Sequence, residues 1–130
     1  MARRASSHPT ELELEILNVL WREGPLPVRG VREALAPGRK LAYTSVMTVM
    51  NIMADKGYLR RVKRGGSFVY HTRVSRRPTV GKMLKDLVDR AFGGSPAAAA
   101  LNLLETADVD DEELKKLREL IGRKSKESKP

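Results

Sequence analysis

The stretch that decides the fold runs from Leu41 to Thr72 and reads LAYTSVMTVMNIMADKGYLRRVKRGGSFVYHT. Its first half carries apolar residues at every third or fourth position, which predicts a helix over about residues 43–56. Its second half holds two β-rich segments on either side of Gly65-Gly66, and adjacent glycines supply the positive φ angles of a tight hairpin turn. A helix followed by a basic hairpin is typical of the surface that a winged helix lays on duplex DNA.

Two further helices are predicted before this stretch. Thr10 and Glu13 have the spacing of a capping box, which opens a helix that ends near Gly24. After the short extended piece Pro25-Leu26, Pro27 suits the first turn of a second helix. The resulting order is helix, strand, helix, helix, hairpin. It matches the winged variant of the helix-turn-helix, in which the third helix enters the major groove.

One side of the third helix is expected to face DNA. Its Thr and Ser side chains can contact phosphates, base edges or thymine methyls, and Asn51 can pair with adenine through two hydrogen bonds. Thr44 or Ser45 has an alternative role, which is to cap the helix. With the cations before the helix and in the hairpin, the expected DNA contacts are Arg39, Lys40, Tyr43, Thr44, Ser45, Thr48, Asn51, Arg60, Arg61, Lys63 and Arg64.

The net charge of +9 is unevenly distributed along the chain. Residues 1–77 carry 15 Lys and Arg against 6 Asp and Glu, whereas residues 78–130 carry 10 of each kind. Basic segments bind nucleic acid by neutralising phosphates, although a merely solvated basic surface is the alternative. Four cations within residues 60–64 favour DNA binding, because protection of an exposed strand edge would explain only one or two of them.

Residues 75–79 are expected to form a connection, because Pro78 disfavours helix in the residue before it. Three short amphipathic helices should follow. They are too small to be stable alone, and a second copy of the same segment is the most economical partner. The expected dimer contacts are Leu84, Leu87, Val88, Phe92, Leu101, Leu104, Leu114, Leu117, Leu120 and Ile121.

The predicted fold is therefore mainly α with a small β-hairpin. A winged helix-turn-helix DNA-binding domain is expected over residues 1–77 and a helical dimerisation region over residues 78–123. Residues 124–130 are expected to form a disordered charged tail.

Several classes of protein are excluded by composition. The absence of Cys removes disulfides, thiolate chemistry and Cys-based zinc sites, and with only two histidines we expect no metal and no cofactor. No hydrolase, phosphate-loop or zinc-protease motif is present, so we do not expect an enzyme. No apolar run approaches the roughly 20 residues that span a bilayer, and we expect a cytoplasmic protein without direct membrane insertion.

A non-specific DNA-packaging or RNA-binding protein is the competing interpretation, because charge alone would permit it. Such a protein would lack a distinct neutral dimerisation segment.

Five segments carry a family resemblance: ELEILNVLW, AYTSVMTVM, ADKGYLRR, FGGS and LNLLETADVDDEELKKLREL. Over about residues 10–123 the chain resembles the penicillinase-repressor family of bacterial transcription regulators. That family contains the β-lactamase and methicillin-resistance repressors and copper-responsive relatives. The resemblance implies a homodimer with winged-helix heads and an interlocked three-helix C-terminal region. It also implies repression of genes, among them antibiotic-resistance genes, from palindromic operators.

The resemblance extends to control of the repressor. In the β-lactam-responsive members, a membrane sensor detects the antibiotic and repression is relieved by proteolysis at an Asn-Phe bond in the dimerisation region. The corresponding position looks like Asn102-Leu103, with Leu in place of Phe. Members often carry Arg where this chain has Ile52, which removes one phosphate contact. The C-terminal cysteine motif of the copper-responsive relatives is missing, so the resemblance implies no metal sensing of that type.

Overall fold

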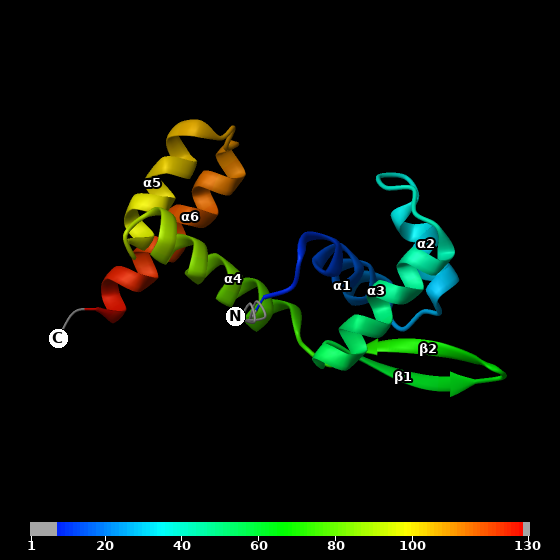
Figure 1. The fold of residues 1–130 in the computed structure, drawn as a ribbon. Helices are drawn as coiled ribbons and strands as arrows, with labels where there is room; N and C mark the ends of the chain where they lie inside the picture. Colours follow the sequence, from blue (N-terminus) through cyan, green and yellow to red (C-terminus); the bar gives the residue numbers. More distant parts are fainter. Residues whose placement is uncertain (1–7, 129–130) are drawn as a thin grey trace. The chain divides into compact units, whose positions relative to one another are not determined.

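The computed structural model describes residues 8–128, which form two compact units that divide between Leu84 and Lys85. We name the unit that ends at Leu84 the head and the unit that begins at Lys85 the C-terminal unit. The elements are α1 (Glu11–Glu23), α2 (Val28–Leu35), α3 (Tyr43–Lys56), β1 (Leu59–Arg64), β2 (Ser67–Thr72), α4 (Arg76–Ala91), α5 (Pro96–Thr106) and α6 (Asp111–Glu127) (Figure 1). The predicted fold class, mainly helical with a hairpin, is confirmed.

The core of the head lies where α1, α2 and α3 meet and the hairpin packs against them. Helical spacing places one apolar stripe of each helix inward, and each side chain of this size contributes about 1.5–3 kcal/mol when it is buried. Among the described residues, the largest fully buried side chains are Ile16, Leu17, Val31, Val46, Met50, Met53 and Leu59. This packing fixes the rotation of α3 about its axis, so its opposite side faces solvent.

The start of α1 is tied to the end of α3. The capping box is present, since the Thr10 hydroxyl accepts from the Glu13 N–H at 3.2 Å and Glu13 Oε1 accepts from the Thr10 N–H at 2.8 Å. The buried Glu13 carboxylate also pairs with Lys56 Nζ at 2.8 Å. Burial disfavours the charged carboxylate, but the bonds from Lys56 and Thr10 and the Lys56 charge outweigh it, so the pKa of Glu13 is lowered.

The hairpin is a two-residue turn between regularly paired strands. Arg64 pairs with Ser67, and Gly65 and Gly66 have φ angles of 54° and 88°, the left-handed region that a tight hairpin turn of this kind requires. Leu26 forms a single isolated bridge with Tyr70, whose N–H donates to the Leu26 carbonyl at 2.9 Å. The predicted order of three helices followed by a hairpin is confirmed, whereas the strand predicted between the first two helices is reduced to this one bridge at Leu26.

Trp21 packs at the edge of the head. Its indole N–H donates to the Val74 carbonyl at 3.0 Å, and the ring lies half-buried against the core. The hydrogen bond joins the end of α1 to the segment that leads from β2 into α4.

The observed helices differ from the prediction at both ends of the C-terminal region. The predicted connection over residues 75–79 is helical from Arg76, with Pro78 in the first turn, where a missing N–H breaks no intrahelical bond. The expected boundary between residues 77 and 78 therefore falls inside α4. The predicted disordered tail is helical over residues 124–127, because α6 continues to Glu127. Residues 129–130 lie outside the described part of the chain.

The helices of the C-terminal unit have defined starts but little burial. Ser95 caps α5 by accepting from the Ala98 N–H at 3.0 Å, and Asp110 and Glu113 form a capping box at α6. None of the described residues of α4, α5 and α6 is buried. Across residues 8–128, no helix has the length and apolar character needed to cross a membrane.

Candidate nucleic-acid interface

The N-terminal turn of α3 exposes Thr44 and Ser45, two of the hydroxyl side chains that are predicted from the sequence to contact DNA. Ala42 occupies the N-cap position, and no side chain caps the helix. The capping alternative for Thr44 and Ser45 is therefore wrong, and both side chains are exposed. Tyr43, at the first position of the helix, is 46% exposed.

Thr48 lies one turn further along the same exposed side of α3. Its hydroxyl donates to the Thr44 carbonyl at 2.8 Å, so its proton is used within the helix. The methyl group and the lone pairs of the hydroxyl oxygen are not used by this bond. Thr48 can therefore touch a thymine methyl or accept a hydrogen bond from a base edge.

Asn51 has partners within the head. Its Oδ1 accepts from the Tyr70 hydroxyl at 2.9 Å and from Arg61 Nη1 at 3.0 Å. Pairing with adenine through two hydrogen bonds needs the same oxygen as an acceptor. The structure thus brings Asn51 to the hairpin, and it adds Tyr70, which sequence reasoning had not assigned to the interface.

The four cations of the hairpin are divided between its two faces. Side chains alternate along a strand, so Arg61 and Lys63 share a face with the buried Leu59, whereas Arg60 and Arg64 lie on the other face. All four are exposed. A phosphate backbone that passes the hairpin on either side therefore meets two positive charges.

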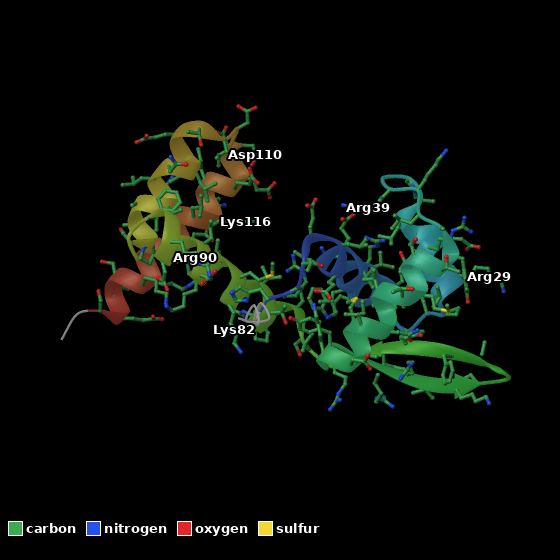
Figure 2. All side chains as sticks on the ribbon, in the orientation of Figure 1. Arg29, Arg39, Lys82, Arg90, Asp110 and Lys116 are labelled. Carbon is green, nitrogen blue, oxygen red and sulfur yellow. The ribbon has the colours of Figure 1, made fainter. Side chains whose placement is uncertain are left out.

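Arg39 and Lys40, between α2 and α3, differ in their surroundings. The Arg39 guanidinium contacts Glu15 at 2.6 Å and Glu11 at 3.6 Å, which ties the loop to α1 (Figure 2). Lys40 is exposed. The positive charge of Arg39 is thus offset locally, and Lys40 is the better placed of the two for a phosphate.

A hollow of about 550 Å³ joins the exposed side of α3 to the hairpin. Two exposed aromatic rings, Tyr43 and Phe68, lie on its wall. Arg29, in the first turn of α2, lines it as well (Figure 2). Sequence reasoning missed Arg29; its place directly after the Pro27 helix start was the available signal. The lining residues are Pro27, Val28, Arg29, Tyr43, Met47, Gly66, Ser67, Phe68 and Tyr70.

The residues expected to join two copies of the chain are accessible in the single chain. Those that are exposed are Leu84, Leu87, Leu101, Leu104, Leu117, Leu120 and Ile121, and those that are half-buried are Val88, Phe92 and Leu114. α5 and α6 also line an open, mostly apolar groove of about 600 Å³, which includes Leu104, Leu117 and Leu120. Such a surface is available to a partner.

The expected cleavage position, Asn102-Leu103, lies inside α5. Both side chains are exposed, and the Asn102 carbonyl accepts from the Thr106 hydroxyl at 2.7 Å. In residues 8–128, no cluster of three or more His, Asp and Glu side chains has the geometry to hold a metal ion.

Comparison with known proteins agrees with this arrangement. The sequence profile of the penicillinase repressor family matches residues 9–123. The transcriptional regulator BlaI of Mycobacterium tuberculosis is 33% identical over 103 residues, which cover 78% of this chain and 75% of that protein. The methicillin resistance regulatory protein MecI of Mammaliicoccus sciuri is 22% identical over 112 residues, 86% of this chain and 91% of that protein. The chain therefore belongs to the penicillinase repressor family of transcriptional repressors.

Proposed function

We propose that this repressor binds palindromic operators as a homodimer, in the cytoplasm, and keeps the adjacent genes silent. The observation that carries the proposal is the row of exposed hydroxyl side chains on α3, Thr44, Ser45 and Thr48, beside a cationic hairpin in the same head. Two such heads about one helical turn apart can read two half-sites of a palindrome.

The two parts of the head have different tasks in this proposal. Thr44, Ser45 and Thr48 address base edges in the major groove, whereas Lys40 and the hairpin cations hold the phosphate backbone. The described inner turns of α3 carry no Arg or Lys, so guanine is not the main base that this helix reads. Contacts to thymine methyls fit the exposed side better, since Tyr43 and Ile52 add accessible apolar surface.

Dimerisation is assigned to α4, α5 and α6. Their apolar side chains stay accessible in the single chain, with Leu101 and Leu103 each 59% exposed. Burial of each such leucine stabilises an association by about 1.5–3 kcal/mol, and a two-fold axis makes every contact count twice. A second copy supplies the same apolar faces and therefore fits them.

We further propose that the controlled genes include β-lactam-resistance or related genes, since a relative carries the name methicillin resistance regulatory protein. In this scheme a membrane sensor-protease system triggers cleavage at Asn102-Leu103. Because the bond lies inside α5, that helix has to open locally before a protease can accept it. The cut would detach α6 and its dimer contacts but leave the head intact.

The test is binding of the full chain to the promoter region of its own gene and to random duplex at two salt concentrations. We expect a strong preference for a palindromic segment, and we expect that preference to survive the higher salt. Equal and steeply salt-dependent binding to both duplexes would contradict the proposal and favour a packaging protein.

A further inference from the structure

We propose that Asn51 is a positioning residue that joins α3 to the hairpin through Tyr70 and Arg61, a role that rests on the DNA binding proposed above. We name these three residues the Asn51 junction. It sets where the hairpin meets the phosphate backbone relative to the helix that reads bases. Asn51 would otherwise be expected to read adenine, as its place on the exposed side of α3 indicates.

The hydrogen bonds of the junction leave the Asn51 oxygen fully used. An amide oxygen has two lone pairs, and here one accepts from the Tyr70 hydroxyl at 2.9 Å and the other from Arg61 Nη1 at 3.0 Å. Arg61 can only donate, which identifies the Asn51 atom that faces it as the oxygen. Reading adenine through two hydrogen bonds requires the Asn51 oxygen to accept from the base, so at least one bond of the junction would have to break.

Tyr70 anchors the junction in the core of the head. Its side chain is 3% exposed, and its backbone pairs with Leu26. Burial raises the pKa of the Tyr70 phenol, so the hydroxyl keeps its proton and remains a donor. Removal of the Asn51 oxygen would leave the proton of this buried hydroxyl without its acceptor, which is unfavourable.

Arg61 links the junction to the exposed surface of the hairpin that is proposed to meet DNA. It lies opposite Tyr70 in the strand register, and its guanidinium lies 5.9 Å from the centroid of the Phe68 ring. Only one of its five N–H donors is needed for Asn51, so the others remain for a phosphate. Asn51 and Phe68 together hold a phosphate-binding cation at a fixed place beside α3.

This arrangement separates the role of Asn51 from that of Thr48. A residue that positions a backbone contact affects binding to every sequence alike, whereas a residue that reads a base affects the difference between sequences. Loss of the junction should therefore lower affinity without changing preference.

The first experiment measures amide hydrogen exchange of the full chain without DNA. We expect Asn51→Leu to speed exchange in the hairpin, residues 59–72, at least about fivefold, because it removes both hydrogen bonds of the junction. Asn51→Asp keeps a carboxylate acceptor and should keep the protection. Tyr70→Phe removes only the hydroxyl and should act in the same direction as Asn51→Leu. Unchanged exchange in both Asn51→Leu and Tyr70→Phe would overturn the proposal.

Tyr58→Phe is the matched control for Tyr70→Phe. Tyr58 is half-buried next to β1, and its hydroxyl makes no hydrogen bond within residues 8–128. We expect no change in hairpin exchange for this variant. A rise equal to that of Tyr70→Phe would mean that any lost tyrosine hydroxyl loosens the hairpin, and the junction would have no special role.

The second experiment measures binding to the promoter segment and to random duplex at two salt concentrations. We expect Asn51→Leu to weaken both by about tenfold, with an unchanged ratio, and to reduce the slope of log K against log salt by about 1. It should add no further loss to Arg61→Met. A reduced preference for the promoter with an unchanged salt slope would show that Asn51 reads a base. If the unmodified chain has no preference at all, the proposed function fails, while the exchange experiment still decides whether the junction holds the hairpin.

Discussion

The head and the C-terminal unit are built from similar amphipathic helices, but only the head closes a core. The twelve buried hydrophobic residues found within residues 8–128 lie between Ile16 and Tyr70, and none lies in α4, α5 or α6. In the head, three helices and a hairpin converge on the same side chains. In the C-terminal unit, leucines at the same kind of spacing remain exposed. An amphipathic pattern thus predicts which face is buried, but other elements must be present to bury it.

The difference has a thermodynamic meaning. A closed core makes stability a property of one chain, whereas a surface that needs a second copy links stability to protein concentration. The head should then resist dilution, and the C-terminal unit should not.

The first prediction breaks the core of the head. Leu17→Ala removes a fully buried side chain and should destabilise the head by about 2–5 kcal/mol at every protein concentration. Leu101→Ala, at a position 59% exposed in the single chain, should instead lower stability by an amount that shrinks toward zero as the protein is diluted and the dimer dissociates. Urea unfolding at two concentrations measures both. A concentration-dependent Leu17→Ala effect would remove the distinction between the units.

The second prediction breaks the proposed contact between copies. Leu117→Lys places a charge in the apolar groove and should weaken the dimer by about 3 kcal/mol, or roughly 100-fold in dissociation constant. Glu119→Lys is the control. It changes the net charge by more than Leu117→Lys does, but by helical spacing Glu119 lies on the side of α6 opposite to Leu117. Sedimentation equilibrium measures both. Equal weakening by the two variants would point to net charge as the cause.

The third prediction concerns the link between α1 and α3. The pKa of Glu13 is lowered in the folded head, so its ion pair with Lys56 stabilises the head above the ordinary Glu pKa of about 4.3. This contribution is lost as the pH falls through the lowered value. Glu13→Gln should therefore destabilise by about 1–2 kcal/mol at pH 7, with a difference that shrinks below about pH 4.

Glu15→Gln provides the comparison for Glu13→Gln. Glu15 pairs with Arg39 at a more exposed position, and its loss should change stability by less than about 1 kcal/mol. Denaturant unfolding at several pH values measures both variants. If the loss of stability caused by Glu13→Gln stayed constant down to pH 2, the ionised carboxylate would be excluded as the source of that stability.

The fourth prediction changes DNA reading without touching the core. Thr48→Ala should reduce discrimination between promoter and random duplex by about 1 kcal/mol and leave stability within about 0.5 kcal/mol. Binding titrations with both duplexes measure the discrimination. Equal loss on the two duplexes would assign Thr48 to the backbone.

The element boundaries of the head could be predicted from the sequence more accurately than those at the ends of the C-terminal region, and local sequence features explain the difference. The bounds of α3 and the position of the hairpin turn follow from an uninterrupted apolar stripe and from glycines that adopt positive φ. The sequence predicts a connection at the start of α4 because Pro78 disfavours helix in the residue before it, but proline also fits a first helical turn, which is where the structure has it. The end of α6 was missed because its last turns have few apolar residues. Lys124 and Lys126 favour a helix there because their positive charges are attracted to the negative C-terminal end of the helix dipole.

Contacts between elements distant in the sequence could not be predicted in the same way. The Asn51 junction depends on the rotation of α3 and on the strand register together, and it joins residues 19 positions apart. The pair of Glu13 with Lys56 spans 43 positions. Residue type showed that each side chain was polar and able to bond, but only the packed head determines which partner is within reach.

The fluorescence of Trp21 can report on the conformation of the head. This residue is the one tryptophan of the chain, and its indole N–H is held by the Val74 carbonyl, two residues before α4 begins. Departure of that segment would expose the indole to water and shift its fluorescence emission to longer wavelength. Events in the helices beyond the head that pull on this segment can therefore be followed in solution without an added dye.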